Sequence, residues 1–194
     1  MMYVRKDLPL QSTMPIFETH IKDKGMDNAI KKHINKGDKI NHKSNVKADM
    51  TEWSMQSETG FKKLAEIVLD MAVKGSKERY NRPIRPVISD MWGMRYKSGE
   101  QAILHDHWPA LWSFAYYLNA PEGAPGLFFK EMGAQGGMRK LEPGLLIISF
   151  SNLKEFINTK YKGNKKIILN KTDNSNCLLN ISFQPPFFQD KLTQ

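Results

Sequence analysis

The chain has 194 residues, with 29 Lys and Arg against 20 Asp and Glu, which gives a formal net charge of +9. This length, with a hydrophobic content of 40%, predicts one ordinary globular domain whose core is large enough to be stable without disulfide bonds or other cross-links. The one cysteine, Cys177, excludes an internal disulfide framework and fits a reducing, intracellular compartment. No apolar run reaches the length of a membrane-spanning helix.

The positive charge is concentrated in two segments. Residues 1–50 hold ten Lys and Arg against six Asp and Glu, and residues 154–171 hold six Lys against the one acidic residue Glu155. Such an excess favours acidic partner surfaces, although solvated loops and helix faces explain it more simply. No motif of interleaved basic and aromatic residues indicates nucleic-acid binding.

Two helices are predicted in the first half of the chain. Met26–Lys36 is predicted as a short basic helix. Thr59–Lys74 carries apolar residues at the spacing i, i+3, i+4, i+7, i+8 and i+11, which is one face of a helix. Gly75 predicts the end of this second helix, and we expect its apolar face to pack on the core.

After residues 81–86, which contain two prolines, the pattern changes to short strands separated by turns. Strands at this spacing are typical of a sandwich or barrel, so the sequence predicts a mainly β fold with helices packed outside a jelly roll. The predicted strands are Val87–Tyr96, Ala102–Trp108, Leu111–Leu118, Leu127–Met132, Met138–Leu141, Leu145–Phe150, Lys166–Asn170 and Cys177–Phe183.

A pair of histidines gives the strongest indication of chemistry. His105 and His107 are two residues apart in a predicted strand, where alternate side chains project from the same face. Their Cα atoms would lie about 6.7 Å apart, which suits two imidazoles that hold one metal ion. The aromatic residues that follow are expected to fill the core rather than to build a substrate pocket; they are Trp108, Trp112, Phe114, Tyr116 and Tyr117.

Three segments resemble the family of 2-oxoglutarate/Fe(II)-dependent oxygenases, in particular its branch that is frequent in marine bacteriophages. His105–Leu118 is similar to the family's metal-binding strand, and residues 44–53 and 143–148 are weaker matches. The resemblance covers residues 44–183 and implies a double-stranded β-helix, a cupin-like jelly roll. Residues 1–194 are then one domain, with an N-terminal extension and basic helix (1–43), the jelly roll (44–183) and a C-terminal arm (184–194).

In this family a histidine, a carboxylate two residues later and a distant histidine hold Fe(II), which leaves positions open for 2-oxoglutarate and oxygen. An arginine near the last strands usually binds the far carboxylate of 2-oxoglutarate. In this chain His107 occupies the position of the carboxylate. The position expected for the distant histidine falls on or near Glu155, and no arginine follows Arg139. Depending on how residues 160–176 are aligned, the arginine position falls near Lys165 and Lys166 or near Asn174 and Ser175.

Two interpretations follow from these differences. In one, His105, His107 and Glu155 form a rearranged metal triad, Lys165 or Lys166 binds 2-oxoglutarate, and the chain is an active dioxygenase that uses Fe(II) and 2-oxoglutarate. In the other, which the sequence alone favours, the site is degenerate and holds no cofactor. The protein is then a structural or interaction module, such as a component of a phage particle. A metal- or ligand-binding cupin without redox chemistry is a third, weaker hypothesis.

The C-terminal arm bears on the partners of the chain. Its first residues, Gln184–Phe188, combine two prolines with two phenylalanines and do not read as a core strand. Exposed apolar residues that follow a domain often dock on another surface. The arm therefore predicts contact with a partner protein or with a second copy of the chain.

Overall fold

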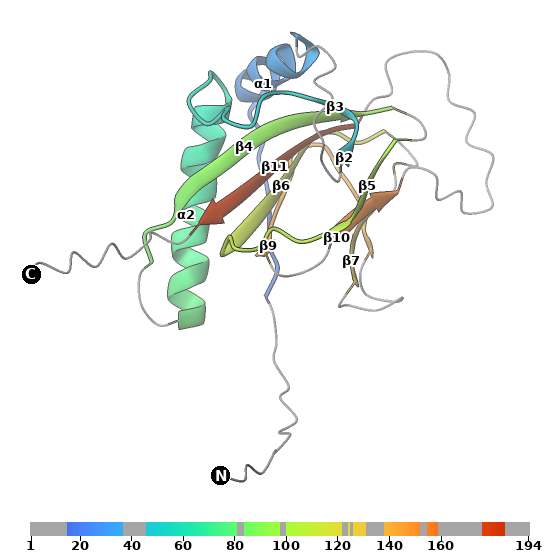
Figure 1. Cartoon of the computed structure of the whole chain (residues 1–194). Helices are drawn as coiled ribbons and strands as arrows, with labels where there is room; N and C mark the ends of the chain where they lie inside the picture. Colours follow the sequence, from blue (N-terminus) through green and yellow to red (C-terminus); the bar gives the residue numbers. More distant parts are fainter. Residues whose placement is uncertain are drawn as a thin grey trace, which may run out of the picture.

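The computed structural model describes residues 15–36, 46–80, 84–97, 100–121, 124, 126–130, 138–151, 155–158 and 176–184. Residues 46–47, 79, 138–139, 155–158 and 176–184 are described by their backbone alone. Its strands form the two antiparallel sheets of a jelly roll (Figure 1). The larger sheet has the order β1 (Phe17–His20), β9 (Leu145–Phe150), β6 (Trp112–Asn119), β11 (Asn176–Gln184), β4 (Val87–Tyr96) and β3 (Asp49–Met50). The smaller sheet has the order β2 (Val46–Lys47), β5 (Gln101–His105), β10 (Glu155–Asn158), β7 (Leu127–Phe129) and β8 (Met138–Arg139).

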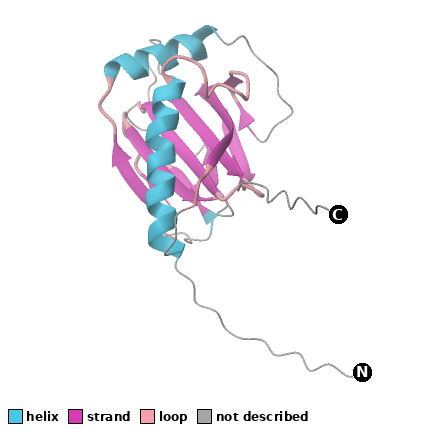
Figure 2. Ribbon diagram, turned by 90° about the vertical axis from the view of Figure 1, so that its left-hand side faces the viewer, coloured by secondary structure: helices cyan, strands magenta, loops and turns pink. Residues whose placement is uncertain are grey.

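The helices α1 (Lys24–Lys36) and α2 (Phe61–Tyr80) cover one face of the larger sheet (Figure 2). Two hydrogen bonds tie strand β6 to them: Trp112 Nε1 donates to Ser76 Oγ over 2.9 Å, and the Tyr116 hydroxyl donates to Asp27 Oδ1 over 2.7 Å. The alternate residues of β6 face the inside of the roll, so the strand is buried on both faces. The predicted arrangement, a jelly roll with helices outside it, is confirmed.

Helix α2 does not end at Gly75, and that part of the prediction is wrong. A Cβ atom at Gly75 would lie 3.0 Å from Phe17 Cε2 and 3.4 Å from Trp112 Cη2. The glycine therefore lets the helix approach β1 and β6 closely, and Ser76 then reaches Trp112 Nε1. Glycine inside a helix costs about 1 kcal/mol relative to alanine, and the close packing offsets this cost.

Most predicted strands are present, with ends that differ from the prediction by a few residues. The strands β4 (Val87–Tyr96) and β9 (Leu145–Phe150) begin and end at the predicted residues. The predicted strand Ala102–Trp108 is wrong at its end, because β5 stops at His105. A turn follows, in which Trp108 N donates to Asp106 Oδ1 over 3.3 Å and Ala110 N donates to the His107 carbonyl over 2.9 Å. The sequence pattern missed β1, β2, β3 and β10, and the predicted strand at residues 166–170 lies outside the described residues.

The segment predicted as an N-terminal extension contributes a strand to the jelly roll. Strand β1 pairs with β9, with Phe17 opposite Ile148 and His20 opposite Leu145. Residues 1–14 and 185–194 lie outside the described part of the chain, so the docking of the C-terminal arm stays a prediction.

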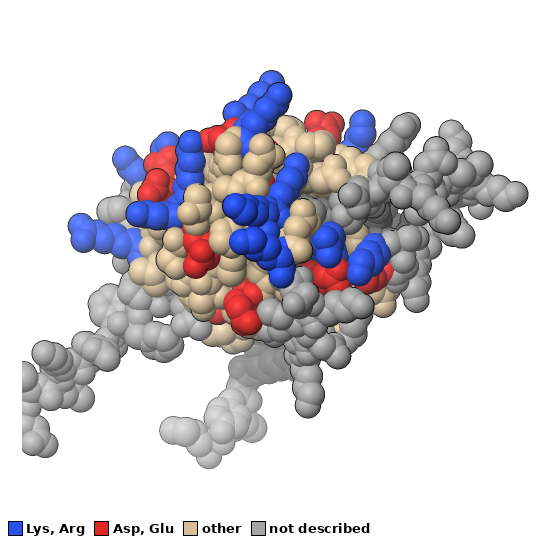
Figure 3. All heavy atoms as spheres, turned by 90° about the horizontal axis from the view of Figure 1, so that it is seen from above, with Lys and Arg blue, Asp and Glu red and all other residues tan. Residues whose placement is uncertain are grey.

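The face of the molecule that carries α1 shows Lys and Arg side chains gathered in its middle, with Asp and Glu around them (Figure 3). Some of this charge is paired, as in the ion pair between Lys63 and Asp23. The predicted preference for acidic partners is compatible with this face and stays a prediction. Among the described residues, neither helix is both long and apolar enough to cross a bilayer.

The hydrogen bond from Tyr116 to Asp27 predicts a loss of stability in alkaline solution. Burial, the hydrogen bond and the Asp27 charge raise the pKa of Tyr116 above its ordinary range. Because the unfolded tyrosine ionises near pH 10 and the folded one does not, this stabilisation is complete below about pH 10 and falls as the pH rises further, by at most about 1.4 kcal/mol per pH unit.

Urea unfolding between pH 9 and 11 measures this effect. The wild-type free energy of unfolding should fall more steeply than that of Tyr116→Phe, which lacks the ionising hydroxyl. Parallel pH profiles for the two proteins would show that Tyr116 ionises equally in the folded and unfolded states.

Candidate functional site

His105 is the last residue of β5, and its ring is oriented by the backbone of its own strand. His105 Nδ1 lies 2.7 Å from the carbonyl oxygen of Ile103. Because a carbonyl oxygen only accepts hydrogen bonds, Nδ1 carries a proton, and in the neutral ring Nε2 is the nitrogen that can bind a metal. A histidine that binds a metal through one nitrogen usually donates the other N–H to an acceptor of this kind.

His107 lies in the turn after β5, and its backbone is fixed to the end of β9. His107 N donates to the carbonyl oxygen of Ser151 over 2.8 Å, and Ser151 N donates to the carbonyl oxygen of Leu111 over 3.2 Å. The Ser151 hydroxyl also donates to the carbonyl oxygen of Ala110. This network of hydrogen bonds holds the segment that carries His107 at one place on the rim of the larger sheet.

The two imidazoles lie next to each other, although His107 is outside β5 and the predicted shared strand is wrong. Their ring centroids lie 4.9 Å apart, with the planes at 69°. A first-row metal about 2.1 Å from one nitrogen of each ring, with an angle of about 90–110° between the bonds, would separate the two centroids by roughly 4.6–5.3 Å. The separation of the two rings is therefore within the range that a shared metal ion requires.

The third predicted ligand, Glu155, begins strand β10. The register places Glu155 directly opposite His105 of β5 on one side and opposite Phe129 of β7 on the other. Among the side chains that the structure describes, no group of three His, Cys, Asp or Glu is arranged to hold a metal. The backbone thus places Glu155 beside His105, while the role of Glu155 as a ligand stays a prediction. Lys165 and Lys166 lie outside the described residues, so their contact with 2-oxoglutarate also stays a prediction.

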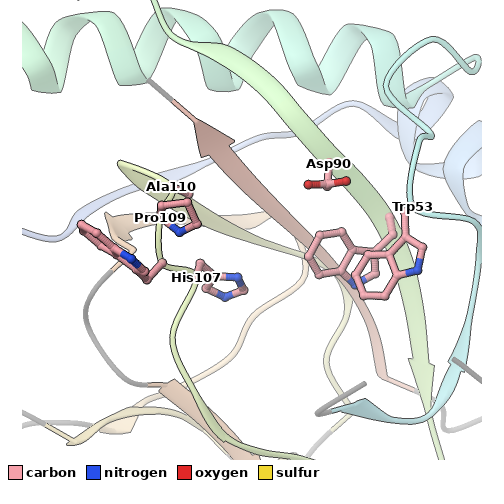
Figure 4. Close-up of a pocket in the computed structure, with 7 residues that line it drawn as sticks. Trp53, Asp90, His107, Pro109 and Ala110 are labelled. Carbon is pink, nitrogen blue, oxygen red and sulfur yellow. The ribbon is translucent and has the colours of Figure 1, made fainter. Parts of the chain in front are cut away.

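A pocket of about 290 Å³ lies beside His107. In Figure 4, His107 lies between the segment of Pro109 and Ala110 and the ring of Trp53, with Asp90 on the ribbon above. The volume is close to the lower end of the range for small-molecule sites, about 300–1,000 Å³. The pocket is lined by Trp53, Asp90, Trp92, His107, Trp108, Pro109 and Ala110.

The sequence interpretation missed the walls of this pocket. Gly93 faces Ile34 and Phe61 of the helices, so the alternation of β4 turns Asp90 and Trp92 to the opposite side, toward His107. That alternation was available in the predicted strand Val87–Tyr96. The expectation that Trp108 fills the core is wrong, because Trp108 is 77% exposed. The other four aromatic residues of that group are buried, as expected.

No protein-family model matches the sequence, and no curated protein matches it. Solved structures do resemble the chain. The viral collagen prolyl hydroxylase of Paramecium bursaria Chlorella virus-1, in complex with 2-oxoglutarate, is 17% identical with a TM-score of 0.60, over 87% of this chain and 94% of that one. A prolyl-4-hydroxylase of Pseudomonas putida is 12% identical with a TM-score of 0.59, over 89% of this chain and 94% of that one.

These similarities extend over most of both chains, and they show the fold. The chain has a double-stranded β-helix, a jelly-roll fold that these two hydroxylases share. This agrees with the fold that the resemblance of His105–Leu118 implied. Because fold alone does not determine function, the activity has to be inferred from the site.

Proposed function

We propose that this chain is a metal-dependent oxygenase of the 2-oxoglutarate/Fe(II) type, in which His105, His107 and Glu155 hold the iron. The observation that carries the proposal is the close approach of the two imidazoles, 4.9 Å between centroids, at the strand position that pairs with Glu155. Two histidines and one carboxylate are the ligand set of non-haem Fe(II) oxygenases. The set is the usual one, with the carboxylate and one histidine in exchanged positions.

Each residue would have a separate task at this site. His105 would bind through Nε2 while the Ile103 carbonyl holds its ring, and His107 would bind from a turn that Ser151 fixes. Lys165 or Lys166 would supply a positive charge for the far carboxylate of 2-oxoglutarate, as a point charge rather than the planar fork of an arginine. Bound iron would supply oxidative decarboxylation of 2-oxoglutarate coupled to hydroxylation of a substrate.

The test of this proposal is metal binding and turnover in the same preparation. The protein, loaded with Fe(II) without oxygen and then exposed to oxygen and 2-oxoglutarate, should form succinate. His105→Ala should weaken metal binding at least about 100-fold, because loss of a second-shell partner alone typically costs about 10–100-fold, and it should abolish succinate formation.

The matched control is His20→Ala. His20 lies at the surface, 3.4 Å from Glu142, and its removal should change neither metal binding nor succinate formation. Wild-type protein that binds metal no better than His105→Ala would overturn the proposal.

A second candidate function is a noncatalytic interaction module with a degenerate site, such as a part of a phage particle. It is favoured by the absence of any histidine after His107 and of any arginine after Arg139. Exposed apolar residues near the site also favour a partner protein or a second copy: Ile103 is 44%, Leu104 42% and Trp108 77% exposed. This candidate requires that no metal binds at the histidine pair and that a stable complex forms.

A further inference from the structure

Helix α1 carries four lysines that have no acidic partner among the described residues. They are Lys24, Lys31, Lys32 and Lys36, against the single acid Asp27. Lys24, Lys32 and Lys36 are exposed, and Lys31 is half-buried. None of the four forms an ion pair with a residue that the structure describes. The helix lies on the face where Figure 3 shows Lys and Arg side chains gathered.

The packing of α1 turns this charge outward. Its buried residues, Met26, Ile30 and Ile34, recur every four residues and face the core. Asp27 Oδ1 accepts a hydrogen bond from the Tyr116 hydroxyl, so the one acid of the helix is directed toward β6. The outward side of the helix is therefore cationic along its length.

The positive charge continues from α1 onto the end of β4. Arg95 Nη1 donates to Asn35 Oδ1 of the helix over 3.0 Å. Arg95 and Lys97 both form an ion pair with Asp49, at 3.0 and 2.9 Å. Because two cations share one carboxylate, this corner adds a net positive charge beside the helix. The four lysines of α1 and this corner together form the α1 surface.

We propose that the α1 surface binds the phosphate backbone of a nucleic acid duplex without reading its base sequence. Lys24 and Lys36 stand at the two ends of the helix, about 18 Å apart along an axis that rises 1.5 Å per residue. One phosphate or one carboxylate does not reach both, so the matching ligand is an extended polyanion. A duplex carries one negative charge per about 1.7 Å of its axis. Contacts from lysines to phosphates hold a duplex but carry no sequence information.

Other anionic partners fit the α1 surface less well. Protein interfaces are built around aromatic residues and contain few lysines, and the exposed large apolar residues that the structure describes all lie outside α1. A basic helix that lies on a membrane inserts an apolar face, and the apolar face of α1 is buried. Single strands are held by stacking of bases on aromatic rings, which the described residues of the α1 surface do not offer.

The α1 surface and the proposed metal site lie on different sides of the larger sheet. Gly93 of β4 faces Ile34 and Phe61 of the helices, whereas its neighbour Trp92 lines the pocket beside His107. The helices cover the outer face of that sheet (Figure 2). Binding to the α1 surface therefore needs neither iron nor 2-oxoglutarate, and the inference does not depend on the proposed function.

The test titrates a short, fluorescently labelled DNA duplex with the metal-free, full-length chain and follows its anisotropy at several salt concentrations. Binding should have a Kd of about 10⁻⁶–10⁻⁴ M at physiological salt, the range of sequence-independent contacts. The logarithm of the association constant should fall with the logarithm of the salt concentration with a slope of about −3.6, since each of four phosphate contacts contributes about −0.9. Two duplexes of unrelated sequence should bind equally.

Variants locate the duplex on the helix. Lys32→Gln with Lys36→Gln should weaken duplex binding at least about 10-fold and make the salt slope shallower by about 1.8, because two phosphate contacts are lost. The matched control, Lys74→Gln with Lys77→Gln, removes the same charge from exposed positions at the far end of α2 (Figure 1). It should leave the Kd and the slope unchanged. Circular dichroism establishes that each variant is folded.

Four outcomes would overturn the proposal. The first is an unchanged Kd and slope in the α1 variant, and the second is an equal loss in the control, which would report net charge alone. The third is tighter binding of a single strand of the same length. The fourth is stronger competition by polyglutamate of matched charge than by unlabelled duplex, which would assign the surface to an acidic protein. Succinate formation should be the same in the α1 variant and the wild type, so the two proposals fail separately.

Discussion

Exchanging the ligands at positions 107 and 155 is expected to preserve metal binding. The double variant His107→Asp with Glu155→His restores the family order, with a carboxylate two residues after His105 and a histidine on β10. If the wild-type triad is a rearrangement, both proteins present two imidazoles and one carboxylate around the same point. We expect their affinities for Fe(II) to agree within about 10-fold, whereas Glu155→Ala should lose at least about 100-fold.

The same experiment separates the rearranged site from a degenerate one. In a degenerate site the wild type would bind no metal, and only the double variant would gain affinity. The matched control exchanges His20 and Glu142, whose side chains lie 3.4 Å apart at the surface. That exchange also moves a histidine and a carboxylate, but it lies outside the site and should leave metal affinity unchanged. Anaerobic titration with Fe(II) measures all four proteins.

Local patterns predicted the elements of this fold because each depends on residues close in sequence. The apolar spacing of Thr59–Lys74 identified α2, and alternation with turn residues identified β4 and β9 within their observed bounds. Gly75 failed as a helix end because its role depends on Phe17 and Trp112, which come from distant strands. Very short strands such as β2 and β3 carry too few residues for a periodic signal.

The histidine pair of the candidate site was recognised from the sequence, but its geometry was predicted only in part. His105 and His107 were recognised from their spacing, yet His107 lies in a turn and approaches its partner through hydrogen bonds to Ser151. The pocket wall could not be derived from any one segment, since Trp53, Asp90 and His107 come together only when the sheets close. The resemblance of residues 44–53 included Trp53 but gave no role for it.

Replacing Trp112 by alanine is expected to cause the largest loss of stability of any substitution considered. Trp112 is fully buried between the larger sheet and α2. Its ring stacks on Phe150 with centroids 4.2 Å apart, and Phe17 packs against it edge-on at 5.9 Å. Truncation of a buried tryptophan typically costs about 3–5 kcal/mol, a large part of the 5–15 kcal/mol that holds a domain of this kind together. Urea unfolding gives the difference directly.

Trp108→Ala is the matched control, because it removes the same side chain from a position that is 77% exposed. Exposed substitutions usually change stability by about 0.5 kcal/mol or less. Ser76→Ala separates the hydrogen bond from the packing, since it leaves the buried Trp112 Nε1 without its acceptor at a cost of about 1–3 kcal/mol. Trp112→Phe keeps an aromatic ring and should lose less than alanine if the fold tolerates it. Equal losses for Trp108→Ala and Trp112→Ala would mean that α2 does not pack on β6 through this tryptophan, and the placement of the helix on the sheet would be wrong.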